Sequence, residues 1–308
     1  MTIPLTLSTA ELTATIDPQG ARLQTLSFRG GPSLVLHADT TTHPAWAATY
    51  AGAVVGPVAN RVRGGRVPIG GVVHQMPCNE NGQAALHSGP DGLDQQVWQG
   101  VAQARDHLHL RCQMADGAGG LPGNRVFDLR YGLESACLTL EINGTSDQVT
   151  PMALAHHPYW RLGRASDHLL QVAATRYLPV DAANIPTGEV APVAGTWRDH
   201  RTAHAPDARL DHCFCTDDAP HAQPRQVASL RGSDGLVMQI ETTEPGLQVY
   251  AGAFLPALPQ TDIGPCAGLA LEPQGWPDAV NQPAFPSVLY GPARPYRQVT
   301  RYRFSQVT

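Results

Sequence analysis

The stretch Gly268–Asn281, with the sequence GLALEPQGWPDAVN, combines a short apolar run with a single acidic residue. The run Leu269-Ala270-Leu271 predicts a buried strand, and Glu272 follows at its predicted end. A carboxylate in such a place is seldom there for packing, because acidic side chains are almost never fully buried without a partner. Pro277 and Asp278 then indicate a turn. The stretch predicts either a surface glutamate at a strand–turn boundary or a carboxylate held for chemistry.

A second stretch, Pro151–Leu162 (PMALAHHPYWRL), supplies a histidine that could work with this carboxylate. His156 and His157 are adjacent, and on an extended strand adjacent side chains point to opposite faces. Only one of the two can therefore face a cleft, while the other must be solvated or satisfied in the interior. Because an imidazole titrates near neutral pH, the histidine in the cleft and Glu272 could form an acid–base pair.

Alternation of apolar and polar residues predicts half-buried strands along much of the chain. Leu5–Asp17 and Ala21–Arg29 alternate loosely on either side of Pro18-Gln19-Gly20, which predicts an opening antiparallel hairpin. No amphipathic helix longer than about three turns is found. The sequence therefore predicts an all-β protein, with the clearest strands in segments 108–114, 138–143, 236–241 and 296–304.

Proline and glycine residues are distributed along the whole chain. The 308 residues include 27 prolines and 30 glycines but only 15% charged residues, which suits many short strands and turns. No linker, composition break or internal repeat divides the sequence, so we expect a single domain over residues 1–308. We expect Gly188–Ala208, which is rich in Pro, His, Arg and Asp, to be a surface loop.

The composition excludes several classes of function. The chain contains no lysine, which excludes Schiff-base and pyridoxal phosphate chemistry and a P-loop. The mild net charge of −5 and the lack of a basic run predict no nucleic-acid partner. No run of eighteen apolar residues occurs, so we expect no contact with a membrane. Six cysteines without C-x-x-C spacing, and an N-terminus without a basic signal region, predict reduced thiols in a cytoplasmic protein.

Other polar residues stand in settings that deserve a functional interpretation. Arg61 follows an asparagine among small and apolar residues, where a guanidinium usually has a carboxylate or a ligand as partner. His87 precedes a turn, and Asp211 precedes an apolar strand, where an aspartate is most often a turn residue. His107 and His109 could share one strand face, but no further ligand lies at metal spacing nearby. We therefore expect no metal site.

Taken in order, these segments resemble the aldose 1-epimerase (galactose mutarotase) family nearly from end to end. Any one of them is a weak signal, but eight in the right order are a strong one. The segments are GPVANRVRGGRV (56–67), ALHSGPDGLDQQVW (85–98), DGAGGLPGNRVFDLRYGL (116–133), PMALAHHPYWRL (151–162), LDHCF (210–214), LQVYAGAFL (247–255), GLALEPQGWPDAVN (268–281) and FPSVLYGPARPYRQVTRYRF (285–304). The resemblance implies a large antiparallel β-sandwich, the supersandwich, with a sugar cleft on a concave face.

The resemblance also implies a role for each candidate residue, carried over by position. Glu272 would be the general base and His157 the general acid in the interconversion of sugar anomers. The ligand would be a free monosaccharide of the galactose or glucose type, and the reaction would need no cofactor and no metal. The chain would act as a monomer or weak homodimer. The sugar would be bound by Asn60, Arg61, His87, Asp211 and Gln248.

The sequence departs from the family pattern beside several of these residues. His156 stands where an asparagine is usual, Trp160 replaces a phenylalanine, and Ser88 replaces a glycine. Pro158 and Ala253 are further departures. We expect several of them to flank the pocket, so a sugar other than galactose stays an open alternative.

The expected reaction determines which of the two groups is the base. Opening the sugar ring requires a proton to leave the C1 hydroxyl and another to reach the ring oxygen. A carboxyl near its usual pKa of ~4 holds almost no proton at pH 7, whereas a nearby carboxylate raises the pKa of a histidine. We therefore expect an ionised Glu272 as the base and a protonated His157 as the acid. His87 is the main rival for the acid.

Three other functions stay open on the sequence alone. A hexose-phosphate 1-epimerase would use Arg63 or Arg66 to bind the phosphate. A glycoside hydrolase or lyase on a related sandwich would pair Asp211 with Glu272, with their carboxyls ~5–10 Å apart. A carbohydrate-binding or sensing module would need no acid–base pair, so the presence of Glu272 and His157 favours an enzyme.

Overall fold

The protein is described by a computed structural model that covers residues 2–307. These residues form β-strands and six short 3₁₀ helices but no α-helix, which confirms the all-β prediction. No helix in this range has the length and apolar character needed to cross a membrane. The 3₁₀ helices are η1 (Pro44–Thr49), η2 (Gly89–Asp91), η3 (Leu93–Gln95), η4 (Ala118–Gly120), η5 (Ala165–Asp167) and η6 (Ala279–Asn281).

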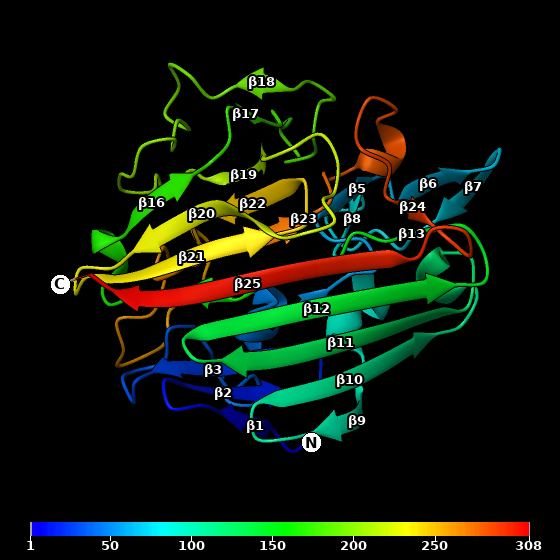
Figure 1. The fold of residues 1–308 in the computed structure, drawn as a ribbon. Coiled ribbons are helices and arrows are strands. Elements are labelled where there is room, and N and C mark those ends of the chain that lie inside the picture. The colour runs from blue at the N-terminus through cyan, green and yellow to red at the C-terminus, as the bar shows by residue number, and fades with distance from the viewer. Residues whose placement is uncertain (1, 308) are drawn as a thin grey trace.

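The largest element is an antiparallel sheet of eight strands, whose long members cross the front of the molecule in Figure 1. Inward side chains such as Leu108 and Leu110 are buried, while the intervening residues of the same strand are at least partly accessible, so the predicted alternation is confirmed. In spatial order the strands are β16 (Leu169–Val172), β20 (Arg225–Arg231), β21 (Leu236–Thr242), β25 (Tyr296–Gln306), β12 (Cys137–Ser146), β11 (Arg125–Glu134), β10 (His107–Met114) and β9 (Gln99–Gln103).

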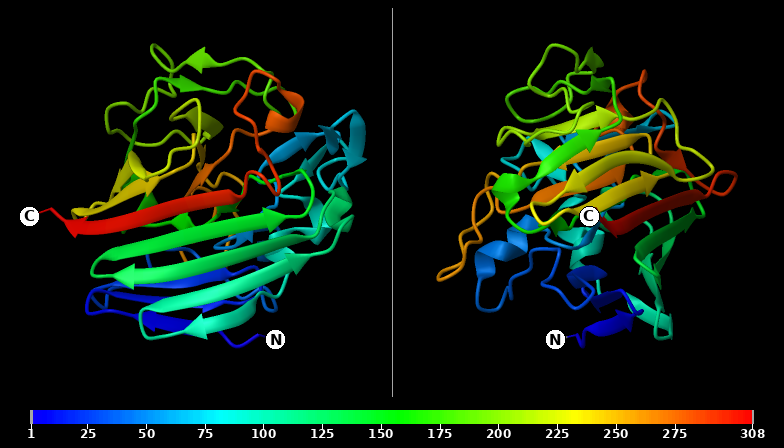
Figure 2. Two further views of the ribbon diagram at one scale, coloured as in Figure 1. Left: turned by 45° about the vertical axis from the view of Figure 1, so that its right-hand side comes forward. Right: turned by 60° about the vertical axis from the view of Figure 1, so that its left-hand side comes forward.

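Two further sheets complete the core (Figure 2). One hydrophobic cluster contains Leu129 of the large sheet together with Leu271 and Leu23 of the other two, so the three sheets enclose a common interior. The six-stranded sheet has the order β15 (Tyr159–Trp160), β23 (Leu269–Gln274), β22 (Gly246–Tyr250), β19 (Asp211–Cys215), β17 (Arg176–Tyr177) and β18 (Ala191–Pro192). The three-stranded sheet consists of β1 (Leu5–Ser8), β2 (Leu12–Asp17) and β3 (Arg22–Phe28).

The predicted N-terminal hairpin is present, but its first half is divided. β2 and β3 form the hairpin, whereas a turn after Ser8 separates β1 from β2. The hydroxyl of Thr9 causes this turn, because it accepts hydrogen bonds from the backbone N–H groups of Glu11 and Leu12. Threonine side chains compete with strand hydrogen bonds in this way.

Strand β23 carries the stretch with which the sequence argument began. The prediction that Glu272 ends this strand is wrong, because β23 continues through Gln274 and all of its residues are buried. Pro273 favours extended backbone in the residue before it, which is compatible with a strand. The neighbouring β22 pairs with β23 as far as Gly246 opposite Gln274. Glu272 therefore lies inside the strand, where β22 pairs with it through Gln248.

Short strands and loops surround this frame. Gly188–Ala208 is irregular apart from β18, as expected, but His200 within it is buried and stacks on His204 with ring centroids 3.9 Å apart. All six cysteines are free thiols. The remaining strands are β4 (Val54–Val55), β5 (Arg61–Arg63), β6 (Arg66–Ile69), β7 (Val72–Gln75), β8 (Ala84–Leu86), β13 (Thr150–Pro151), β14 (Ala155–His156) and β24 (Leu289–Tyr290).

Candidate active site

A pocket of about 280 Å³ lies between the six-stranded sheet and the loops that flank β5, β8 and β14. Its volume is close to the lower end of ligand pockets, which span ~300–1,000 Å³, so it suits a small ligand. The seven residues predicted from the sequence all line this pocket: Asn60, Arg61, His87, His157, Asp211, Gln248 and Glu272.

One wall of the pocket is the six-stranded sheet. Gln248 on β22 lies directly opposite Glu272 on β23, so the two side chains share one face of the sheet. Asp211 is the first residue of β19, and its Oδ1 accepts a hydrogen bond from Gln248 Nε2 at 2.6 Å. The regular strand register therefore fixes three polar groups of the pocket.

The opposite wall consists of loops in unusual backbone conformations. Asn60 has φ 62° and His87 has φ 51°, both in the left-handed region, which asparagine tolerates better than most residues. The backbone N–H of His87 donates to the Asn60 carbonyl at 3.0 Å, and the Asn60 N–H donates to His87 Nδ1 at 3.1 Å. These two bonds join the loops that precede β5 and follow β8.

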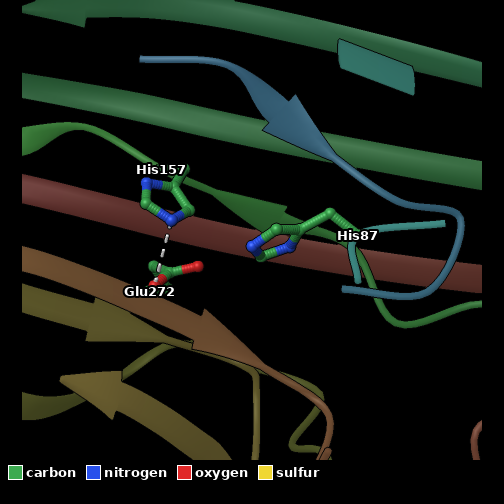
Figure 3. A group of neighbouring side chains, drawn as sticks. All are labelled: His87, His157 and Glu272. Atoms are coloured by element: carbon green, nitrogen blue, oxygen red, sulfur yellow. Dashed lines mark ion pairs between the residues drawn. The ribbon is translucent and has the colours of Figure 1, made fainter. Parts of the chain in front are cut away.

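His157 and Glu272 both line the pocket, and their side chains point toward each other, with His87 nearby (Figure 3). His157 Nε2 lies 3.5 Å from Glu272 Oε1, and their side chains are only 5% and 2% exposed. The backbone of His157 is anchored on the segment before β4, where its N–H donates to the Ala53 carbonyl and its carbonyl accepts from the Gly52 N–H, both at 2.9 Å. The predicted pair is therefore in direct contact and shielded from water.

Burial controls the protonation of this pair. It lowers the pKa of His157 to about 4. Burial, reinforced by Asp211 and opposed by Arg61, raises the pKa of Glu272 well above its usual range. The expectation that a nearby carboxylate raises the pKa of His157 is not met, because burial lowers that pKa instead. In the sugar-free pocket, burial therefore favours the uncharged form of each of the two groups.

His87 is a neutral hydrogen-bond donor to the pocket. Burial, His157 and Arg61 all lower its pKa well below the usual value. Because Nδ1 accepts from the Asn60 N–H, the single proton of the neutral ring must be on Nε2. The ring lies edge-on to His157, with centroids 5.3 Å apart. A neutral ring of this tautomer can donate to a sugar oxygen but has no second proton to supply as an acid.

The same tautomer argues against a metal at this site. His87, His157 and Glu272 can each offer one ligand atom, and these atoms lie within 4.8 Å of one another. A metal ligand must be an unprotonated nitrogen, however, and in His87 the unprotonated nitrogen already accepts from Asn60. The three residues therefore do not fit a metal ion without loss of that hydrogen bond, and a metal-free site stays our prediction.

Arg61 has two carboxylate neighbours. Its Nε and one terminal nitrogen donate to the two oxygens of Glu80 at 2.7 and 2.9 Å. Its other terminal nitrogen lies 3.6 Å from Asp211 Oδ2. Burial alone would lower the pKa of Arg61, but Glu80 and Asp211 outweigh burial and raise it. The prediction of a carboxylate partner for this guanidinium is confirmed.

The histidine beside His157 belongs to the core. His156 is 2% exposed, and its two ring nitrogens lie 3.4 and 3.3 Å from the hydroxyl oxygens of Tyr131 and Tyr302. Of the two alternatives for the second histidine, solvated or satisfied in the interior, the structure shows the second. The departures from the family pattern are not lining residues themselves, but each is a chain neighbour of a residue that lines the pocket: Ser88, His156, Pro158, Trp160 and Ala253.

Sequence reasoning missed several lining residues. Glu80 lies in Asn79-Glu80-Asn81-Gly82, a composition that indicates only a turn. The aromatic residues Tyr50, Tyr159 and Tyr250 also line the pocket, and each could equally be a core residue by its pattern. Phe254 is 86% exposed at the pocket, and an exposed phenylalanine leaves no periodic signal.

The fold and the pocket define a β-sandwich protein with a buried histidine–glutamate pair in a small polar cavity. A family model for aldose 1-epimerase matches residues 4–303. The chain belongs to the aldose 1-epimerase family, and it is accordingly an isomerase.

Individual relatives agree with this assignment. The chain is 37% identical to the galactose mutarotase of Mus musculus over 277 residues, which are 83% of this chain and 79% of the relative. It is 32% identical to the aldose 1-epimerase of Escherichia coli K12 over 279 residues, 83% and 80% of the two chains.

Solved structures confirm the expected supersandwich form. An aldose epimerase homologue from C. elegans matches with a TM-score of 0.91 at 28% identity and covers all of both chains. The galactose 1-epimerase from Lactobacillus acidophilus matches with a TM-score of 0.84 at 27% identity, over 99% and 95% of the two chains.

Proposed function

We propose that this chain interconverts the α and β anomers of a free aldose of the galactose or glucose type, with Glu272 as general base and His157 as general acid. The observation that carries the proposal is the contact of His157 Nε2 with Glu272 Oε1 at 3.5 Å in a buried pocket. The similarity to galactose mutarotase supports the choice of sugar. Ring opening needs two proton transfers at neighbouring oxygens, and these two groups can perform both.

The proposed steps conserve protons and electrons. Glu272 accepts the proton of the C1 hydroxyl, the C1–O1 bond becomes a carbonyl, and the bond from C1 to the ring oxygen breaks. The ring oxygen keeps that electron pair and takes the proton of His157. The aldehyde then turns about the C1–C2 bond, and the reverse transfers close the ring on the other face. Each cycle returns the pair to its starting state.

The acting form of the pair has its proton on His157, whereas burial without a sugar favours the proton on Glu272. Both arrangements contain one proton, so sugar binding has only to shift its position between two atoms in contact. A C1 hydroxyl that donates to Glu272 stabilises the carboxylate, and a ring oxygen that accepts from His157 stabilises the imidazolium. Arg61 also favours the ionised Glu272.

The remaining polar groups suit a polyhydroxyl ligand. His87 offers a donor, Asp211 offers acceptors, and Arg61 offers the nitrogen that faces Asp211. We propose that these three, together with Asn60 and Gln248, bind the hydroxyls that do not react and so hold the sugar while C1 turns.

The charge of the pocket favours an unphosphorylated sugar. Glu80, Asp211 and Glu272 supply three carboxyl groups, while Arg61 is the only arginine among the described lining residues and faces two of those groups. Arg63 instead pairs with Asp181 at 2.8 Å, and neither Arg63 nor Arg66 lines the pocket. A phosphate would therefore meet mainly negative charge.

The proposal also includes a single-domain organisation and a cytoplasmic location. A single domain over residues 1–308 is supported by one family match that runs from residue 4 to residue 303. A cytoplasmic location is supported by the six free cysteines, because oxidising compartments favour disulfides.

Polarimetry tests the proposed function directly. Freshly dissolved α-D-galactose and α-D-glucose change their optical rotation as the anomers equilibrate, and we expect the protein to accelerate this change well above the rate in buffer. The variant Glu272→Gln/His157→Asn serves as the control for catalysis by the protein surface. If no aldose were accelerated while a sugar still bound in equilibrium dialysis, the chain would be a binding module instead.

A further inference from the structure

We infer that Glu80 is a positioning residue for sugar binding, which orients Arg61 and keeps its guanidinium away from Glu272. This inference rests on the proposed function, because it takes Arg61 to be a sugar-binding residue. Glu80 lines the same pocket but belongs to no motif of the sequence, and its role follows from its contacts alone.

The contact between Glu80 and Arg61 fixes the plane of the guanidinium. Glu80 Oε2 accepts from Arg61 Nε at 2.7 Å, and Glu80 Oε1 accepts from a terminal nitrogen at 2.9 Å. Two parallel bonds of this kind determine direction as well as distance, unlike a single ion pair. They leave the other terminal nitrogen of Arg61 pointing toward Asp211 Oδ2, 3.6 Å away.

The backbone holds Glu80 in place for this contact. Its N–H donates to the Ala84 carbonyl at 3.2 Å, and its carbonyl accepts from the Gln83 and Ala84 N–H groups at 2.9 and 3.3 Å. The strand β8 that follows pairs with β5, which begins at Arg61. Glu80 and Arg61 are therefore attached to the same two-stranded unit, and their distance does not depend on a flexible loop.

Without Glu80 the arginine would have other partners. The side chain of Arg61 is only 12% exposed, and the nearby carboxyl groups within the pocket are those of Asp211 and Glu272. An arginine without its tether would pair more closely with Asp211 or move toward Glu272. The first movement would occupy the Asp211 carboxyl, which is proposed to bind the sugar, and the second would occupy the Glu272 carboxyl, which is the proposed base. Glu80 therefore keeps both carboxyls available.

The test replaces the carboxylate of Glu80 by an amide of the same shape. In Glu80→Gln one oxygen can still accept from Arg61, but the charge and one of the two bonds are lost. We expect KM for α-D-galactose to rise about tenfold, the equivalent of one charge-assisted hydrogen bond. We expect kcat to fall much less, because His157 and Glu272 are untouched.

A matched control is available beside the N-terminal sheet, in the turns before β2 and after β3. Glu11 Oε1 accepts from Arg29 at 3.1 and 2.6 Å, so Glu11→Gln removes the same charge from another Glu–Arg pair, outside the pocket. We expect Glu11→Gln to leave KM and kcat at their wild-type values. Glu80→Asp keeps the charge with a shorter reach, and we expect it to recover part of the lost affinity.

A double-mutant cycle separates positioning from general damage. A lysine at position 61 cannot donate the two parallel hydrogen bonds that Arg61 makes to Glu80. Glu80→Gln should therefore raise KM little further when it is added to Arg61→Lys. If Arg61→Lys weakens sugar binding while Glu80→Gln behaves like Glu11→Gln, the inference about Glu80 is wrong and the role of Arg61 stands. If Arg61→Lys itself has wild-type kinetics, the proposed sugar-binding role of Arg61 fails as well.

Discussion

The most informative perturbation is Glu272→Gln, because it preserves the shape of the side chain and removes its ability to exchange a proton. We expect kcat for galactose to fall by ~10²–10⁴, the usual contribution of one positioned acid–base group. The loss should be specific, because His157 is the side chain with which the structure pairs this carboxyl. The fall should appear in kcat rather than in KM.

The contact between the two groups also predicts how their losses combine. Glu272 Oε1 and His157 Nε2 lie 3.5 Å apart, so in the proposed mechanism each substitution interrupts the same proton transfer. His157→Asn should therefore cost about as much as Glu272→Gln, and the double variant should be little slower than either. Independent groups would multiply their losses instead, and the double variant would then be slower by ~10⁴ or more.

Stability distinguishes lost chemistry from lost folding. Burial raises the pKa of Glu272 in the folded state above its unfolded value. The stability that this group contributes is thus complete below the unfolded pKa and is lost as pH rises toward the folded pKa. Glutamine cannot ionise, so Glu272→Gln should unfold at a temperature that equals or exceeds that of the wild type at pH 8, with a smaller difference near pH 4.5.

The assays are polarimetry on fresh α-D-galactose, for kcat and KM, and calorimetric unfolding from pH 4.5 to 8. An inactive but stable Glu272→Gln meets the expectation. A variant with near-wild-type kcat would show that the mechanism is wrong for this chain. A variant whose melting temperature falls steeply at pH 8 would show that the carboxylate is ionised and stabilising in the folded protein.

Three further predictions concern other buried groups. His87→Asn should raise KM more than it lowers kcat, because His87 is a neutral donor; an effect on kcat as large as that of His157→Asn in polarimetry would make the two histidines share the acid role. Burial lowers the pKa of His156 to about 3. Folding therefore favours the neutral ring, and the wild type loses stability as the pH falls below 6.5. Between pH 7.5 and pH 5, His156→Asn should lose about 2 kcal/mol less unfolding free energy than the wild type, as measured by urea unfolding. Burial raises the pKa of Glu244 to about 8. Relative to the wild type, the unfolding free energy of Glu244→Gln should accordingly be higher at pH 7 than at pH 4.5 by about 3 kcal/mol. An equal difference from the wild type at both pH values would contradict a buried neutral carboxyl.

The sequence could predict the members of the pocket but not their protonation. The strand pattern and the order of the segments led to Glu272, His157 and their neighbours, because residue types and spacing are written in the chain. The pKa values depend on how completely water is excluded, which is a property of the assembled sheets. The sequence predicts a carboxylate close to His157 but not the burial of both groups, and it is burial that lowers the pKa of His157 and raises that of Glu272.

Glu80 could not be predicted from the sequence as a partner of Arg61, for a different reason. The sequence indicated that Arg61 needs a carboxylate, and Asp211 was already known as a candidate. Glu80 lies nineteen residues further along the chain in what looks like an ordinary turn. Only the pairing of β5 with β8 brings that turn beside Arg61, and such pairing over a loop leaves no local pattern.

The arrangement of the two walls also bears on the choice of sugar. The departures from the family pattern do not line the pocket; among them, Trp160 packs against Tyr302, and the Ser88 hydroxyl accepts from the Val58 N–H at 2.9 Å. A side chain that contacts no ligand can alter sugar preference only by moving one that does. The polar residues that line the pocket are those implied by the family resemblance, together with Thr49, Glu80, Asn184 and the tyrosines Tyr50, Tyr159 and Tyr250. We therefore expect galactose and glucose to be accepted, and any discrimination between them to come from the loop wall of Asn60, Arg61 and Glu80 rather than from the sheet.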